Sequence, residues 1–142
     1  MYKNMIQIIV FTVLLFSWGC KGSPAWFALA SEEDVAALTT DQLCIAYGSR
    51  STTSSWEMRS PKLRHELEQR NLFTPTQWIR IEDRQISVGD SKLLVLAAWG
   101  YPDRRYDSSG GYSNWTYRQY GSATYVTFKY DIVTRTSRAR WK

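Results

Sequence analysis

The sequence has few of the side chains that build metal centres and disulfide frameworks. Among 142 residues it contains one histidine, His65, and two cysteines, Cys20 and Cys44. A single histidine excludes a metal site made of several histidines, and two cysteines allow no disulfide framework. The sequence also contains no Gly-x-Ser-x-Gly segment, so it lacks the nucleophile turn of the α/β-hydrolases.

These absences leave one pair that could supply a nucleophile and a base, Cys44 with His65. His65 lies between Arg64 and Glu66 in a helical pattern, which favours a half-exposed helix histidine. Cys44 fits a small, buried apolar position, and the alternative for it is an intermolecular disulfide. We therefore expect a non-enzymatic protein with no catalytic residues, metal, cofactor or small-molecule substrate.

Long apolar runs are missing as well, and the one at the N-terminus is too short to span a membrane. Residues 5–18 follow Lys3 and are mostly apolar, but a spanning helix needs roughly 20 such residues. The run closes on Ser17-Trp18-Gly19-Cys20, which resembles the bacterial lipobox. A positive start, an apolar core and a small residue before a cut are typical of a secretion signal. The sequence therefore predicts a lipoprotein signal peptide over residues 1–19 and lipidation of Cys20.

A second cleavage point leaves an alternative open. The small-x-small segment Ala28-Leu29-Ala30 suits ordinary signal peptidase, and cleavage there would release a secreted or periplasmic protein beginning at Ser31. With lipidation, Lys21 in place of the usual inner-membrane retention aspartate favours the periplasmic face of the outer membrane. Residues 20–38 then form the lipidated cysteine and a tether, and residues 39–142 the folded domain.

The formal charge of +5 is mildly basic. Such an excess favours contact with anionic lipid headgroups or with acidic protein surfaces. Export would separate the protein from nucleic acid, so we expect no nucleic-acid partner.

Capping residues predict several short helices before residue 103. Serine or threonine, twice followed by proline, marks their starts. These starts lie at Ser31, at Thr40 or Asp41, at Ser60-Pro61, at Thr74-Pro75 and at Asp90-Ser91. The last helix should end at Gly100-Tyr101-Pro102, because glycine stops a helix and proline prevents its resumption. Residues 103–107 fit a polar loop, in which Asp103 and Asp107 could bind a cation only weakly.

From Tyr112 the pattern changes to strands over residues 112–120, 123–130 and 132–138. Three sequential strands with short breaks predict an antiparallel meander. Helices followed by strands predict an α+β fold with helices on one sheet face. We therefore expect two or three short helices packed on a three-stranded antiparallel sheet, in the order α-α-β-β-β. Trp115 and Phe128 are the expected core residues.

Aromatic residues are abundant, with nine tyrosines and seven tryptophans. Aromatic side chains are enriched at interfaces because they bring contact area with few rotatable bonds. Four tyrosines of the strands form the candidate partner surface: Tyr112, Tyr117, Tyr120 and Tyr125. The alternative is that these tyrosines fill the core beneath the helices, and both can hold on opposite faces.

Several short motifs resemble one lipoprotein family. Their order along the chain resembles that in the small outer-membrane lipoproteins of the SmpA/OmlA (BamE-like) type. The segments are Val88-Gly89-Asp90-Ser91, the apolar run 93–99, Gly100-Tyr101-Pro102 and Trp115-Thr116-Tyr117. Asp90 stands where methionine is usual. The resemblance implies an α-α-β-β-β fold anchored through Cys20. Because fold does not fix function, the resemblance does not transfer the family's assembly role. From the anchor and the small domain, we expect a docking or stabilising module for envelope protein assembly.

Overall fold

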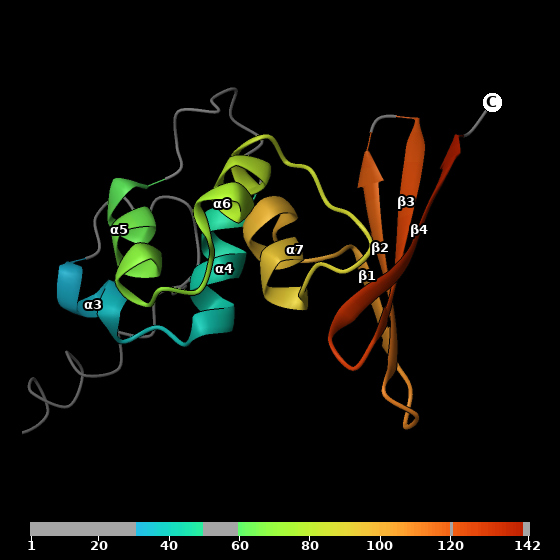
Figure 1. The fold of residues 1–142 in the computed structure, drawn as a ribbon, viewed down its shortest axis with the longest axis horizontal. Coiled ribbons are helices and arrows are strands. Elements are labelled where there is room, and N and C mark those ends of the chain that lie inside the picture. Colours follow the sequence, from blue (N-terminus) through green and yellow to red (C-terminus); the bar gives the residue numbers. More distant parts are fainter. Residues whose placement is uncertain (1–30, 50–59, 120, 141–142) are drawn as a thin grey trace, which may run out of the picture. The chain divides into compact units, whose positions relative to one another are not determined.

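The computed structural model describes residues 31–49, 60–119 and 121–140. The signal segment, Cys20, the tether up to residue 30 and Tyr120 lie outside the described residues. Within the described part, five helices precede a four-stranded antiparallel sheet (Figure 1). The predicted α+β fold is confirmed, but the described part contains five helices rather than two or three, and four strands rather than three. No described helix is both long enough and apolar enough to cross a membrane.

Four of the five described helices begin where the capping residues predict, although Ser60 makes no side-chain capping hydrogen bond. The exception is the second helix, which is capped by Thr39 rather than by the predicted Thr40 or Asp41. The helices are α3 (Glu32–Ala36), α4 (Thr40–Gly48), α5 (Pro61–Gln69), α6 (Pro75–Glu82) and α7 (Lys92–Trp99). Ser31, Thr39 and Thr74 each accept a hydrogen bond from the third residue of their helix and complete a capping box. Because α3 is folded and buries Val35, the compact unit begins at Ser31. The boundary expected at residue 39 therefore lies inside this unit.

The sheet order is β1-β2-β3-β4, with every neighbouring pair antiparallel. The strands are β1 (Arg104–Asp107), β2 (Tyr112–Gln119), β3 (Ser122–Lys129) and β4 (Ile132–Arg140). The additional strand is β1, which occupies the segment predicted as a polar loop. All four of its residues are exposed, so it has no alternating pattern to reveal it.

The two aspartates of that segment do not form a cation site. Asp107 ends β1 and pairs with Arg105, whereas Asp103 precedes the strand and accepts a hydrogen bond from the backbone N–H of Arg118. The weak cation-binding hypothesis for Asp103 and Asp107 is therefore wrong, because β1 extends the chain between them.

One face of the sheet, which we call the inner face, packs against α7 (Figure 1). Trp115 and Phe128 lie there almost fully buried, with ring centroids 4.5 Å apart, as predicted for core residues. At the end of α7, Trp99 contacts Tyr117 edge-on with centroids 5.1 Å apart. At its start, the Lys92 N–H donates to the Asp131 carbonyl at 2.8 Å. These contacts attach α7 to the sheet at both of its ends.

Candidate interaction surface

The opposite face of the sheet, which we call the outer face, carries side chains that no described helix covers. Strand alternation and the observed register decide which residues belong to it. They are residues 104 and 106 of β1, the even positions 112–118 of β2, the odd positions 123–129 of β3, and residues 132, 135, 137 and 139 of β4. The irregularity at Thr127/Phe128 shifts the parity of β4 by one residue.

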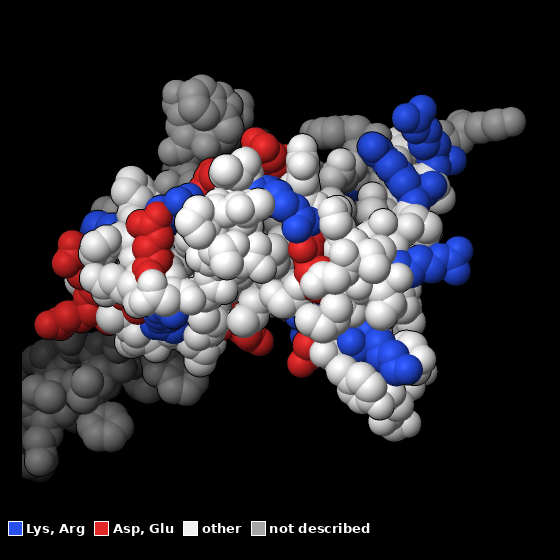
Figure 2. Space-filling model, in the orientation of Figure 1, with Lys and Arg blue, Asp and Glu red and all other residues white. Residues whose placement is uncertain are grey.

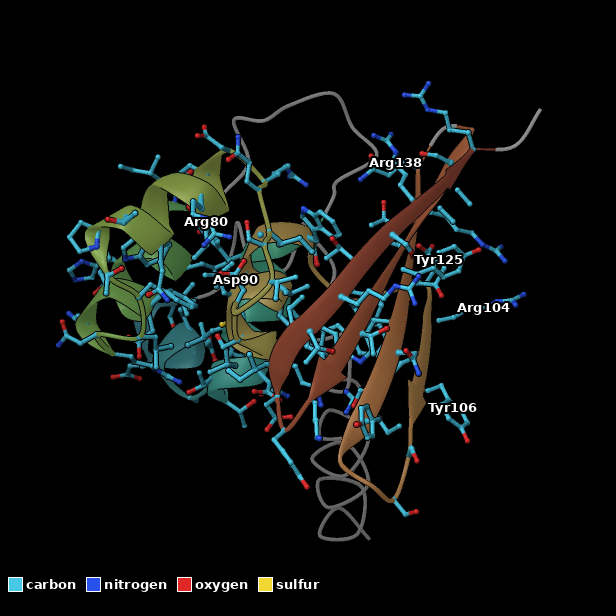
Figure 3. All side chains as sticks on the ribbon, turned by 45° about the vertical axis from the view of Figure 1, so that its right-hand side comes forward. Arg80, Asp90, Arg104, Tyr106, Tyr125 and Arg138 are labelled. Atoms are coloured by element: carbon cyan, nitrogen blue, oxygen red, sulfur yellow. The ribbon has the colours of Figure 1, made fainter. Side chains whose placement is uncertain are left out.

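Three tyrosine side chains on this face are exposed to solvent. Tyr106 is 68% exposed, Tyr112 44% and Tyr125 42%. The register places Arg104, Thr116 and Tyr125 in one row across three strands, and Tyr106 begins the next row. Figure 3 shows Arg104, Tyr106 and Tyr125 pointing away from the helices. The outer face therefore presents aromatic and cationic side chains together.

The charge of the outer face is of one sign. Arg104, Arg118, Lys129 and Arg135 lie on it, and none of its described positions is Asp or Glu. Along the chain, residues 104–142 contain eight Lys and Arg against two Asp and Glu, whereas residues 31–103 contain eight against eleven. In Figure 2, red side chains gather over the helices, and the side of the strands turned away from them shows blue ones. The sheet is the basic part of an electrically asymmetric domain.

Strand geometry fixes these side chains in place. The Thr127 hydroxyl donates to the Asn114 side-chain oxygen at 2.9 Å across β2 and β3. The Lys129 ammonium lies 5.3 Å from the centre of the Tyr112 ring, within the range of a cation–π contact. Cross-strand contacts of this kind limit the rotamers that a partner would otherwise have to order on binding.

Of the four tyrosines predicted to form a partner surface, Tyr112 and Tyr125 are exposed on the outer face. The prediction for Tyr117 is wrong, because it lies on the inner face, is 5% exposed and donates its hydroxyl to the Gly100 carbonyl at 3.1 Å. Burial raises the pKa of Tyr117, with a smaller contribution from Asp103. Tyr120 lies outside the described residues.

Sequence reasoning missed Arg104 and Tyr106. Both lie on β1, and a four-residue strand that is exposed throughout offers too short a pattern to identify. The signal that was available is Tyr106 itself, because tyrosine is enriched in strands.

The structure gives no support to a Cys44–His65 nucleophilic pair. Cys44 is fully buried in α4, as its apolar interpretation predicts, and desolvation followed by the charge of Asp41 raises the pKa of its thiol to about 12. His65 lies exposed on α5, hydrogen-bonded to Gln69 at 2.9 Å. In the described ranges, no group of three His, Cys, Asp or Glu residues is placed to hold a metal ion.

Comparisons with protein-family models, with curated proteins and with solved structures find no match. The resemblance to the SmpA/OmlA lipoproteins therefore stays a prediction from short motifs. Locally, Ser91 caps α7 and Gly100 ends it, as those motifs require. Asp90, which departs from the family pattern, is buried and paired with Arg80. The function has to be argued from the surface that the fold presents.

Proposed function

We propose that this protein is a non-enzymatic docking module of the bacterial envelope. A lipid on Cys20 anchors it to the periplasmic face of the outer membrane, and its outer face binds an acidic surface of another envelope protein. The observation that carries the proposal is the outer face itself, where exposed tyrosines and arginines lie on four strands without any described carboxylate.

The residue types suit an interface with a protein. Tyrosine and arginine are enriched at protein interfaces and among the residues that contribute most to binding. Tyr106 and Tyr125 offer flat apolar area with a hydroxyl at the tip, and Arg104 offers planar donors that match a carboxylate. A partner with Asp and Glu on its surface would complement this charge, which speeds association and selects against basic partners.

An anchor would strengthen a weak contact. Holding the domain and its partner on one membrane raises their effective concentration and removes part of the orientational cost of binding. A small domain with a single binding face can then function at modest intrinsic affinity. The secreted alternative, a soluble binding or inhibitory module cut after Ala30, would use the same outer face without this advantage.

The surface is tested with a double variant, Arg104→Ser with Tyr125→Ser, against Tyr101→Ser as the matched control. Tyr101 is 59% exposed and lies outside the strands. After cross-linking in intact cells, we expect the wild type and the control to recover the same acidic envelope protein. Recovery by the double variant should fall by about tenfold, the change that corresponds to roughly 1.4 kcal/mol of binding free energy.

Salt dependence checks the charge part of the same proposal. Because exposed charges are screened by salt, recovery should fall when the ionic strength rises from about 50 mM to about 500 mM. Equal recovery by the double variant, or recovery of nucleic acid rather than protein, would contradict the proposal.

The anchor is tested separately through Cys20→Ser. We expect this variant to lose palmitate labelling and to leave the membrane fraction, while the wild type has the mass of an acylated chain beginning at Cys20. An unmodified chain beginning at Ser31 would instead establish the secreted alternative. Neither result changes the expectation for the outer face, so the two parts of the proposal can fail independently.

A further inference from the structure

A pocket of about 660 Å³ opens on the inner face of the sheet, beyond the end of α7. This volume lies within the range of roughly 300–1,000 Å³ that is typical of small-molecule sites. Its two walls come from segments far apart in the sequence. One wall is the sheet, at residues such as Gln119, Thr124 and Arg138, and the other is the loop 84–87 with Trp99.

The pocket exists because the inner face changes character along the strands. Where α7 covers it, this face carries Trp115, Val126 and Phe128, all buried. Towards the other end of the same strands, the positions that line the pocket are polar, including Gln119 and Thr124. Gly100, with a φ of 75°, ends α7 there, so the described helices leave the polar end open.

The wall opposite the sheet contains an aromatic side chain fixed in orientation. The Trp99 indole N–H donates to the Arg84 carbonyl at 2.8 Å, and its ring meets Tyr117 at an interplanar angle of 76°. Two independent contacts therefore hold this ring at the rim of the pocket before any ligand arrives. Such preorganisation lowers the entropy cost of binding.

Two charged side chains, Arg84 and Arg138, are among the described residues that line the pocket. The Arg138 Nε and one terminal nitrogen both donate to the Ser122 hydroxyl, at 3.2 and 3.1 Å, and Ser122 is 3% exposed. Figure 3 shows Arg138 projecting from β4 on the side that faces the helices. A guanidinium has five N–H donors, so this contact leaves donors for a ligand. In the described part of the chain, no ion pair involves Arg138 and no lining residue is Asp or Glu.

We infer that this pocket binds a phosphorylated sugar. Arg138 takes the phosphate through planar, charge-assisted hydrogen bonds. The ring hydroxyls, which both donate and accept, match the side-chain amides and hydroxyls of the lining, such as Gln119, Thr124 and Thr136. A cation is disfavoured by Arg138, and an apolar ligand would leave these polar groups without partners.

The first experiment compares three probes on the full-length chain in detergent: glucose 6-phosphate, glucose and inorganic phosphate. Binding is followed by NMR, through the Trp99 indole N–H and the backbone amides of residues 85–87. We expect glucose 6-phosphate to bind about tenfold more tightly than either of the other two, because only this probe engages both kinds of group. Inorganic phosphate binding as tightly as glucose 6-phosphate, or no saturable shift with any probe, would overturn the inference.

The second experiment uses a matched pair of variants on β4. Arg138→Gln removes one of the two positive charges that line the pocket, whereas Arg135→Gln removes a charge on the outer face of the same strand. We expect Arg138→Gln to weaken glucose 6-phosphate binding by about tenfold and Arg135→Gln to change it by less than about twofold. Both side chains are exposed, so neither variant should prevent folding. Equal effects of the two variants would show a general charge effect and would overturn the assignment.

The same chemistry occurs on a free sugar phosphate and on a lipid headgroup that carries one. A short-chain phosphatidylinositol 4-phosphate, kept below its micelle-forming concentration, separates these sources. Tighter binding than glucose 6-phosphate, still lost with Arg138→Gln, identifies the lipid-linked source. Equal or weaker binding identifies the free sugar phosphate. The pocket and the outer face lie on opposite sides of the sheet, so this inference stands or falls independently of the docking proposal.

Discussion

The Arg80 guanidinium binds the Asp90 carboxylate with both of its terminal nitrogens, one of them at 2.8 Å from Oδ1 (Figure 3). Asp90 is 5% exposed and also accepts a hydrogen bond from the Ser87 N–H at 2.6 Å. Its carbonyl accepts from the Val133 N–H, and the Gly89 N–H donates back to the Val133 carbonyl, both at 2.8 Å. One aspartate thus joins α6, the turn before α7 and the first residues of β4.

Asp90→Ala should therefore destabilise the fold strongly. Removal of the carboxylate leaves a partly buried guanidinium and a backbone N–H without their acceptor. We expect the free energy of unfolding to fall by about 3 kcal/mol. This is the lower end of the range for removing one partner of a buried ion pair, because Arg80 remains partly exposed. Chemical denaturation measures the loss, with Asp83→Ala as the control at an exposed acidic position. A loss below about 1 kcal/mol would show that the pair adds little beyond its packing.

Tyr117 and Tyr125 differ in burial, and removal of their hydroxyls should show it. Tyr117→Phe leaves the Gly100 carbonyl without its buried donor and should cost about 1–2 kcal/mol. Tyr125→Phe lies on the outer face and should change stability by less than about 0.5 kcal/mol. Thermal unfolding of the two variants under one condition gives the comparison. Similar losses in both would contradict the division of the sheet into an inner and an outer face.

Local signals in the sequence were enough to predict most of the helices and strands. Ser31, Thr74 and Ser91 cap their helices as expected, because a cap depends on residues only three positions away. Strand alternation likewise identified Trp115 and Phe128 as core residues. Such features need no knowledge of what packs against the element.

Features that depend on distant partners could not be predicted in this way. Alternation placed Tyr117 on the same face as Trp115, but only the position of α7 shows that this face is covered at Tyr117. The strand β1 exists through pairing with β2 rather than through a pattern of its own. The pair of Arg80 with Asp90 and the pocket between loop 84–87 and β4 also require the tertiary fold.

Gly48, at the end of α4, lies against the backbone at the end of α7. A Cβ built on it would lie 2.0 Å from the Leu96 carbonyl oxygen and 2.4 Å from the Gly100 nitrogen, so backbone would have to move. Gly48→Ala should therefore cost roughly 3 kcal/mol or more. Gly121→Ala is the control, because no atom lies within 4 Å of its Cβ and only the strain of a φ of 66° remains. Chemical denaturation measures both variants. Free energies of unfolding that differ by less than about 1 kcal/mol between Gly48→Ala and Gly121→Ala would contradict this packing.

The buried thiol of Cys44 predicts how stability should change in alkaline solution. Burial raises its pKa from an ordinary value of 9.0 to about 12. Between these values the unfolded chain loses a proton that the folded chain keeps, so the free energy of unfolding falls as pH rises. The contribution is complete below pH 9, and the slope reaches at most about 1.4 kcal/mol per pH unit.

Cys44→Ala isolates that slope, because the variant has no thiol to titrate at this position whatever its absolute stability. We expect the decline above pH 9 to become shallower in the variant, measured by urea denaturation at several pH values. A remaining slope is expected from Tyr117, whose pKa burial also raises, and Cys44→Ala with Tyr117→Phe should flatten it further. Parallel curves for the wild type and Cys44→Ala would mean that the thiol titrates alike in both states, which would contradict its burial in α4.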